Sequence, residues 1–258
     1  MPDHAREIVE RFFSIRTGVS VADLKPGQVA VATCDRRTYV ELGKGFVRLL
    51  WIVHLGDRAA LSVHPSALGE VSRLAWGRNP DEVLEDAFVE QARAALATAL
   101  RGVPLRVGDT SISLYHPGDV PAVQTDGQVR VLTTADKGKW PGPRLYMSAA
   151  EHPCAERGEA FGVFLGDTCV AEVITHEPSV REMAHLIAED GIEVAEEYRR
   201  RGYGKAAFAG WTRCMQQRGR VCLHGTGLDN AASIALARSV GYVEYMRSRG
   251  IDYVPPEE

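Results

Sequence analysis

The sequence lacks any apolar run close to the roughly 20 residues that a membrane-spanning helix needs. Its first residues are acidic and polar, unlike a secretory signal. It also lacks an excess of positive charge, since 30 lysines and arginines stand against 34 aspartates and glutamates, a net charge of −4. Binding of nucleic acid through bulk positive charge is therefore disfavoured. These absences predict a protein with neither a membrane nor a nucleic acid as its partner.

Cysteine is also scarce. The five residues are an odd number and do not have the paired spacing of a disulfide framework or a zinc site. We therefore expect thiols in the reducing cytoplasm and no metal. The hydrophobic fraction of 45% and the length of 258 residues suffice for one large domain or two small ones.

The first half of the chain mixes helical and strand patterns. Apolar residues at helical spacing predict a helix over 5–13, and apolar runs predict strands at 29–33, 46–54 and 59–63. Gly56-Asp57 between the last two strands is a hairpin signal. Asn79 and Pro80 mark the start of a long helix that reaches Leu100. Residues 1–120 are therefore predicted to form a separate α+β region.

A segment rich in turn formers, residues 116–121, predicts the connection to a second domain over residues 128–258. The predicted elements of this domain are strands at 129–132, 161–165, 169–174, 221–224 and 242–246, a strand that ends at Val194, and helices at about 204–219 and 230–240. Their order predicts an α/β fold with helices flanking a sheet.

The most informative segment runs from Ile192 to Lys205. An apolar strand leads into a basic turn with two glycines, and the turn opens an amphipathic helix. The first amides of a helix and the positive end of its dipole favour a phosphate or pyrophosphate. Gly202 and Gly204 let backbone donors approach the anion, and Arg199–Arg201 supply further positive charge.

Two common nucleotide-binding motifs fit this turn poorly. The dinucleotide-binding fingerprint requires three glycines after its strand, and this turn has two. A Walker A loop requires a serine or threonine after its lysine, where this sequence has Ala206. A nucleotide-binding enzyme is therefore the weaker interpretation.

The pattern Arg199-x-x-Gly202-x-Gly204 resembles the cofactor motif of the GNAT superfamily of acyl-CoA-dependent N-acetyltransferases. A second motif follows at the expected distance, with Asp229-Asn230-Ala231-Ala232-Ser233 leading to Gly241-Tyr242. It is similar to the Asn-x-x-Ser/Ala helix of that family, which is followed by Gly-Phe/Tyr and a strand. The resemblance covers roughly residues 128–253. It implies a mixed, strongly twisted sheet flanked by helices.

The resemblance also implies which residues contact acetyl-CoA as cosubstrate. The backbone of Ile192, Glu193 and Val194 is expected to align the pantetheine arm as an added strand. The pyrophosphate is expected to lie against the motif formed by Arg199, Arg200, Arg201, Gly202, Tyr203, Gly204 and Lys205. Asn230 is expected to hydrogen-bond the pantetheine or the thioester end. Ser233 is expected either to assist near the phosphates or to cap the short helix.

The catalytic groups are less clearly defined. The family commonly uses a carboxylate or a histidine as general base on the strand before the turn. Strand alternation places Asp190 on the side where that base lies, and a bulge would substitute Glu189. The alternative, that both are solvated carboxylates, stays open. His224 ends the strand before the second motif, close to the expected acyl group, and is interpreted as a structural residue.

One departure from the family concerns Ala237, which stands where many members have a tyrosine that protonates the leaving thiolate. The chain must use another acid or release the thiolate unassisted, and we assign no general acid. The expected reaction is transfer of an acetyl group to a primary amine of a small molecule or peptide. The alternative is a non-catalytic acyl-CoA-binding or sensing module. The N-terminal region is expected to shape the acceptor site or to mediate homodimerisation.

Overall fold

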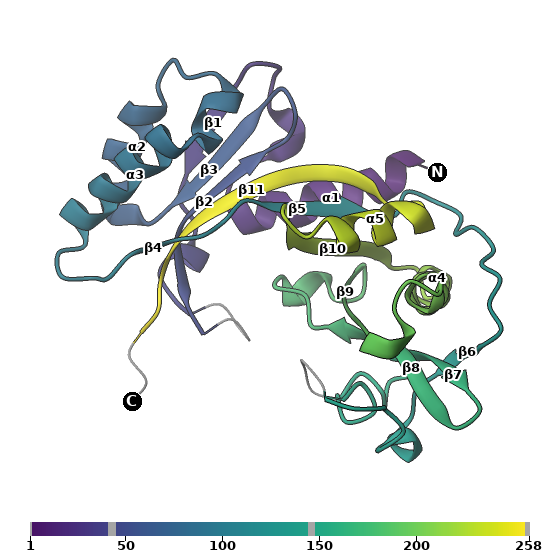
Figure 1. The fold of residues 1–258 in the computed structure, drawn as a ribbon. Helices are drawn as coiled ribbons and strands as arrows, with labels where there is room; N and C mark the ends of the chain where they lie inside the picture. Colours follow the sequence, from purple (N-terminus) through teal and green to yellow (C-terminus); the bar gives the residue numbers. More distant parts are fainter. Residues whose placement is uncertain (1, 41–44, 144–147, 256–258) are drawn as a thin grey trace. The chain divides into compact units, whose positions relative to one another are not determined.

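The computed structural model describes residues 2–40, 45–143 and 148–255 as a mixed α/β fold, in which twisted sheets are flanked by helices (Figure 1). The predicted fold class, including the α+β character of the N-terminal region, is confirmed. The chain divides into two compact units. Unit 1 comprises Met1–Arg6, Leu114–Gly225 and Asn230–Val243, and unit 2 comprises Glu7–Ser113, Thr226–Asp229 and Glu244–Glu258.

The sheet of unit 2 has the strand order β1-β3-β2-β11. Strand β1 is Val29–Ala32, β2 is Val47–His54, β3 is Ala59–Val63, and β11, which enters the unit after Val243, is Val243–Tyr253. Strands β2 and β3 form the predicted antiparallel hairpin, whereas β1 pairs with β3 in parallel. The short β4, Arg106–Val107, pairs with β11.

Three helices accompany this sheet: α1 (Pro2–Thr17), α2 (Leu68–Ala75) and α3 (Asp86–Ala99). Apolar residues of α2 and α3, such as Val71 and Phe88, pack against Leu50 and Ile52 of β2. Phe13 of α1 contacts Trp51, with ring centroids 5.9 Å apart.

The single long helix predicted from Asn79 to Leu100 is wrong in one respect. Asn79 caps a short 3-10 helix, Pro80–Leu84, through a capping box with Glu82. Glu85 is then extended, with ψ of 147°, and serves as the N-cap of α3. The cap at Asn79 is confirmed, but the 3-10 helix that it starts ends before the α-helix. Helix α2 was not predicted.

Unit 1 contains the strand order β10-β9-β8-β7-β6. The strands are β6 (Gln128–Val131), β7 (Phe161–Leu165), β8 (Thr168–His176), β9 (Ile187–Val194) and β10 (Val221–Gly227), the last of which leaves the unit after Gly225. Strands β6 to β9 pair antiparallel, and β9 and β10 pair in parallel. The strands predicted at 129–132, 161–165, 169–174 and 221–224, and the strand end at Val194, are confirmed to within a few residues, whereas β11 extends beyond the predicted strand at 242–246 as far as Tyr253.

Two helices complete unit 1. Helix α4, Tyr203–Gln217, follows β9, and α5, Ala231–Val240, follows β10 and ends at Gly241 in a left-handed conformation. Strand β5, Ser111–Tyr115, enters the unit at Leu114.

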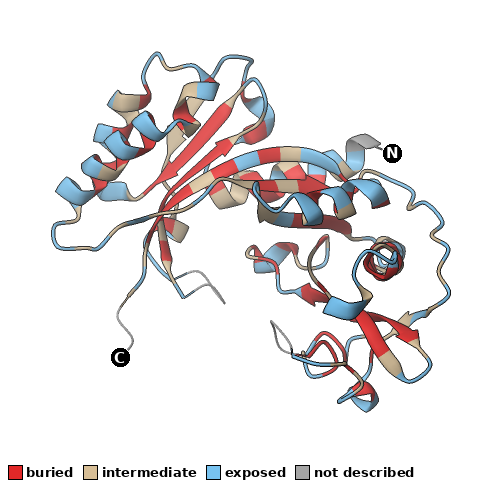
Figure 2. Ribbon diagram, viewed as in Figure 1, coloured by how far each residue is buried: buried red, intermediate tan, exposed pale blue. Residues whose placement is uncertain are grey.

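Short 3-10 helices occur in both units. They lie at Val21–Asp23, Asp35–Arg37, Pro65–Ala67, Thr134–Asp136, Arg181–Met183 and Glu196–Tyr198. Strand β8 is buried over all but its end residues (Figure 2).

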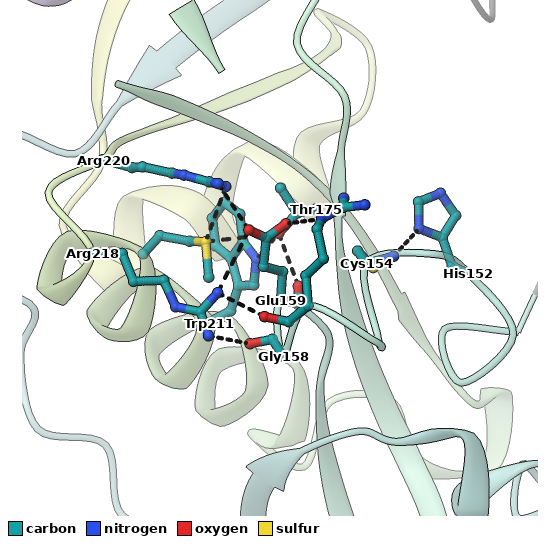
Figure 3. Close-up of polar contacts among 10 residues, drawn as sticks. His152, Cys154, Gly158, Glu159, Thr175, Trp211, Arg218 and Arg220 are labelled. Atoms are coloured by element: carbon teal, nitrogen blue, oxygen red, sulfur yellow. Dashed lines mark hydrogen bonds and ion pairs between the residues drawn. The ribbon is translucent and has the colours of Figure 1, made fainter. Parts of the chain in front are cut away.

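Polar contacts around Glu159 hold together several elements of unit 1 (Figure 3). The buried carboxylate of Glu159 pairs with Arg157 at 3.0 Å, with Arg220 at 2.8 Å and with Arg218 at 3.5 Å. Its carbonyl oxygen accepts a hydrogen bond from Thr175 of β8 at 2.8 Å. The loop before β7, the C-terminal end of α4 and the start of β10 are thereby fixed to β8.

Among the residues that the structure describes, no helix is both long enough and apolar enough to cross a membrane. The cysteines form no disulfide in these parts of the chain.

Candidate active site

The turn between β9 and α4 has an unusual backbone. Arg200 has φ of 62° and Gly202 has φ of 86°, both in the left-handed region. Gly202 is the N-cap of α4 and provides no side-chain cap. The first amides of α4 are therefore left for another acceptor. A turn that contains left-handed residues before a helix start directs backbone N–H groups into a concave anion site.

Gly204, in the first turn of α4, is required for close packing. A Cβ atom at this position would lie 2.9 Å from Cγ2 of Val194 at the end of β9 and 3.7 Å from Leu236 of α5. Even an alanine would force the helix away from the strand. The two glycines of the motif thus act differently, because Gly202 supplies backbone conformation and Gly204 supplies proximity.

Arg199, Arg200 and Arg201 are all exposed. The Arg199 guanidinium donates to the carbonyl oxygen of Val194 at 3.2 Å, and that of Arg201 lies 5.6 Å from the ring centroid of Tyr198. Neither contact neutralises a charge. The turn therefore presents three positive charges next to the backbone donors of α4, a combination that fits a pyrophosphate group.

Strands β9 and β10 separate close to this turn. Within the described chain, they pair only over Ile187–Glu189 and Val221–Leu223, although β9 continues to Val194. On its other edge β9 pairs with β8 up to Val194, without a register shift. One edge of β9 over residues 190–194 is thus left without a β10 partner. An extended ligand can add to such an edge as a further strand.

Three side chains meet where the two strands separate. Asp190 follows the last paired residue of β9, and His224 follows the last paired residue of β10. Both carboxylate oxygens of Asp190 lie 3.0 Å from Nδ1 of His224. Nε2 of the same imidazole lies 2.8 Å from the hydroxyl oxygen of Ser233 in α5. These contacts form a continuous hydrogen-bonded chain from Asp190 to Ser233.

This hydrogen-bonded chain of side chains is buried at one end and accessible at the other. The side chain of Asp190 is fully buried and that of His224 is 5% exposed, whereas Ser233 is only partly buried. Burial alone would lower the pKa of His224, but the charge of Asp190 and the hydrogen bond to it raise this pKa above its ordinary value.

Apolar and neutral groups surround the imidazole of His224. Phe208 of α4 lies at 5.5 Å and Tyr242 at 6.4 Å between ring centroids. Burial raises the pKa of Tyr242 and that of the Cys222 thiol, so both stay neutral around pH 7. Asp190 is therefore the charge that acts on His224 from close range.

Asn230 and Ser233 also form the N-terminus of α5. The side-chain oxygen of Asn230 accepts from the Ser233 amide at 3.1 Å, so Asn230 is the helix cap. Asn230 is exposed, so its side-chain NH2 group is accessible to a ligand. The hydroxyl of Ser233, in contrast, takes part in no cap, because it contacts His224.

The two remaining carboxylates of β9 lie on the other side of the strand from Asp190. Glu189 is partly buried and pairs in register with His176 of β8. Glu193 is buried and stands opposite Glu172. Because β8 and β9 pair regularly over this stretch, Glu189 does not share a side with Asp190. The assignment of Glu189 as general base stays a prediction.

The sequence does not indicate that Asp190, His224 and Ser233 contact one another. It predicts Asp190 as a base and His224 as a structural residue, without connecting them. A signal was present, since two parallel strands linked by one helix end at the same edge of the sheet. The residues that follow the paired segments then become neighbours. The hydroxyl of Ser233 could be placed only once the helical phase of α5 was known.

Comparison with known proteins matches one part of the chain to a family. Residues 131–242 match the sequence model of the acetyltransferase (GNAT) family. This part of the chain is therefore a GNAT acetyltransferase domain. The general activity that follows from the family is acyl transfer from acyl-CoA. A comparison with curated proteins gave no match.

Several solved structures are similar to the chain at low identity. A GNAT-family protein from Novosphingobium aromaticivorans is 20% identical, with a TM-score of 0.45, and the match covers 65% of this chain and 82% of that one. A GCN5-related N-acetyltransferase from Sphaerobacter thermophilus is 13% identical, with a TM-score of 0.47 and coverage of 78% and 73%. A protein from Salmonella typhimurium, solved with its cofactor acetyl-CoA, is 13% identical, with a TM-score of 0.40 and coverage of 52% and 96%.

Proposed function

We propose that this protein transfers an acetyl group from acetyl-CoA to a primary amine of a small molecule or peptide, in the cytoplasm. The observation that carries the proposal is the left-handed turn at Arg200 and Gly202. This turn lies between the first amides of α4 and the edge of β9 that has no β10 partner among the described residues. A ligand with a pyrophosphate and an extended amide-containing arm matches both parts.

The proposed contacts follow the course of that ligand. Backbone amides of Gly202–Lys205 and the side chains of Arg199–Arg201 hold the pyrophosphate. The backbone of Ile192–Val194 aligns the arm as an added strand, and Asn230 hydrogen-bonds it from α5. Acetyl-CoA supplies the activated acyl group as a thioester.

The acceptor amine must lose a proton in order to attack the thioester. Asp190 is fully buried and holds His224 through both oxygens, so its role in this step is to act through the imidazole. Glu189, on the other side of β9, is the second proposed base. Replacing each carboxylate by its amide separates the two, because the true base is the one whose loss removes the acidic limb of the rate profile.

Residues 1–120 are proposed to shape the acceptor site or to join two copies of the chain. Sedimentation of the full chain distinguishes these roles, because a dimerisation region gives a concentration-dependent dimer. A monomer at all concentrations leaves the acceptor-site role.

The proposed function is tested by calorimetry with CoA, followed by a thiol-release screen with acetyl-CoA over amines, amino acids, aminoglycosides and peptides. We expect CoA to bind more tightly than ATP or NAD, and one acceptor class to release thiol. Binding of CoA without thiol release from any acceptor would favour the acyl-CoA-sensing alternative. Tighter binding of ATP or NAD than of CoA would favour a nucleotide-binding enzyme.

A further inference from the structure

The hydrogen-bonded chain Asp190–His224–Ser233 ends at the partly accessible hydroxyl of Ser233. The helix start is already capped by Asn230, and the Ser233 hydroxyl contacts His224 instead of the backbone of its own helix. In contrast, Ser239 of the same helix bonds the carbonyl of Leu236 at 2.7 Å. The buried Asp190 and the partly accessible Ser233 make a polar path from the interior of unit 1 to its surface.

The distance of this hydrogen-bonded chain from the turn defines which part of a bound ligand can contact it. Asp190 lies four positions before Val194, the residue next to the turn, which corresponds to about 13 Å of extended strand. A ligand arm that starts at the turn and follows the open edge of β9 therefore runs toward the point where β9 and β10 join. The reactive end of such an arm would lie beside Ser233.

The arrangement is similar to a serine, histidine and aspartate triad, in which the serine is the nucleophile. Such a nucleophile needs nearby amides to stabilise the oxyanion, commonly that of the following residue. Here the Ser233 amide donates to the Asn230 side chain at 3.1 Å, and the Ile234 amide donates to the Asn230 carbonyl at 3.1 Å. Both amides are committed to the helix, so the geometry favours proton transfer over covalent catalysis.

The geometry points to Ser233 as the proton donor to the CoA thiolate, an inference that rests on the proposed function. As the amine nitrogen bonds to the acyl carbon, the C–S bond breaks and its electron pair passes to sulfur. Sulfur takes the hydroxyl proton of Ser233, and Ser233 takes a proton from Nε2 of His224. The proton that the amine loses balances the one that sulfur gains, and it restores His224 through a base or solvent. Asp190 is a positioning residue that holds the imidazole.

The first test measures the thiol of bound CoA and needs no acceptor. The ultraviolet absorbance of the thiolate is followed as the complex of protein and CoA is titrated. A hydrogen bond from Ser233 to the thiolate lowers the pKa of that thiol, so we expect a value below that of free CoA in the wild type. Ser233→Ala should raise the bound value by about one unit, while Ser233→Thr and Ser239→Ala should leave it unchanged.

The second test varies the leaving group. With acetyl-CoA we expect Ser233→Ala to lower kcat by roughly 100-fold, which is the lower end of general acid catalysis. With an aryl thioacetate, whose thiolate leaves without a proton, the loss should fall to about threefold or less. Ser233→Thr, which keeps a hydroxyl, should restore most of the activity, and Ser239→Ala is the matched control.

The outcomes separate this inference from the proposed function. Equal losses with both donors, an unshifted thiol of bound CoA, or an acetyl group on Ser233 in the mass spectrum would each overturn the role of proton donor while leaving acetyl transfer intact. If CoA does not bind at all, the proposed function fails, and this inference fails with it.

Discussion

Two groups of arginines in unit 1 show how the same side chain serves opposite purposes. Arg157, Arg218 and Arg220 converge on the buried carboxylate of Glu159 (Figure 3). Arg199–Arg201 lie exposed on a turn, and they form no ion pair with any carboxylate among the described residues. The first group links elements of the fold. The second keeps its charge available for a ligand.

The two groups also differ in backbone strain. The arginine turn contains a left-handed non-glycine residue, Arg200, a conformation that costs roughly 1–2 kcal/mol for an L-residue. Such strain persists where the surrounding structure enforces it, and it is commonly found at functional sites. The left-handed residues within the Glu159 cluster, Gly158 and Gly219, are both glycines, which adopt this conformation without strain. Stability should therefore depend on Glu159, and ligand affinity on the turn.

The largest effect is expected for Glu159→Gln. The amide keeps the shape of the side chain but leaves three guanidinium groups around a buried site. Breaking a fully buried ion pair costs about 3–5 kcal/mol. Because the three arginine side chains are 43%, 38% and 20% exposed, we expect a loss of about 2–3 kcal/mol in the free energy of unfolding, measured by urea denaturation.

Glu197→Gln is the matched control, since Glu197 is an exposed carboxylate close to the other arginine group. It should change the free energy of unfolding by less than about 0.5 kcal/mol. CoA affinity of folded Glu159→Gln should equal that of the wild type. Wild-type stability in Glu159→Gln would show that the cluster does not hold the fold together.

The second prediction concerns charge at the turn. Gly202→Asp places a carboxylate where the pyrophosphate is proposed to lie, so CoA affinity in calorimetry should fall roughly tenfold or more, about 1.4 kcal/mol. A Cβ at Gly202 would meet nothing within 4 Å, so the change should not disturb packing. Gly202→Asn has the same shape without the charge, and asparagine tolerates the left-handed region, so it should bind more tightly than Gly202→Asp.

Gly219→Asp controls for the backbone at the other end of α4. Gly219 has φ of 74° and equally open surroundings, so the substitution brings the same strain and the same charge far along the helix from the turn. It should leave CoA affinity unchanged. Equal affinity losses in Gly202→Asp and Gly219→Asp would contradict a pyrophosphate site at the turn.

How far the sequence could predict these features depends on how local their causes are. The turn is encoded within a short segment. The apolar residues up to Val194 indicate a strand, Arg199 to Gly204 indicate the turn, and the apolar stripe that follows indicates a helix. The cap at Asn79 is local in the same sense, and it is confirmed, although the helix that it starts is a 3-10 helix. The break at Glu85 was missed, since apolar spacing alone does not distinguish a 3-10 turn from the first turn of an α-helix.

The contacts of His224 and Glu159 could not be predicted in this way. Asp190 and His224 are neighbours because Glu189 pairs with Leu223 in parallel, and no local pattern fixes that register. Glu159 meets Arg218 and Arg220 across about 60 residues of sequence. Charged residues in a sequence indicate charge only, and the fold decides which become buried partners and which stay available.

The third prediction uses Arg200, where strain and charge coincide. Arg200→Gly removes the left-handed strain, but glycine loses more conformational entropy on folding, which offsets part of the gain. The free energy of unfolding should therefore rise by about 0.5–1 kcal/mol. It also removes one positive charge, so CoA affinity should fall about threefold. Arg201→Gly, which relieves no positive φ, should not stabilise the protein. Stabilisation by both substitutions would mean that strain at Arg200 is not its cause.

The smallest effect is expected for the pH dependence that His224 contributes to stability. Asp190 raises the pKa of this buried imidazole above its unfolded value, against the effect of burial. The folded protein therefore binds this proton more tightly than the unfolded chain. Its contribution to stability is fully present below the unfolded pKa of about 6.5 and is lost as the pH rises through the higher folded pKa.

Asp190→Asn isolates this contribution. The charge is lost while burial remains, so the pKa of His224 should fall below its ordinary value, which NMR titration of the imidazole measures directly. Burial already lowers the pKa of His116 and of His152, and these residues give the opposite slope of stability against pH in both proteins. The difference between wild type and Asp190→Asn removes their effect. Urea unfolding is measured between about pH 5 and 8, the range in which histidine ordinarily titrates. We expect the difference in the free energy of unfolding between wild type and Asp190→Asn to become smaller as the pH rises. An advantage that is constant with pH would mean that Asp190 stabilises the fold without controlling the protonation of His224, and the imidazole would then be a poor source of protons for Ser233.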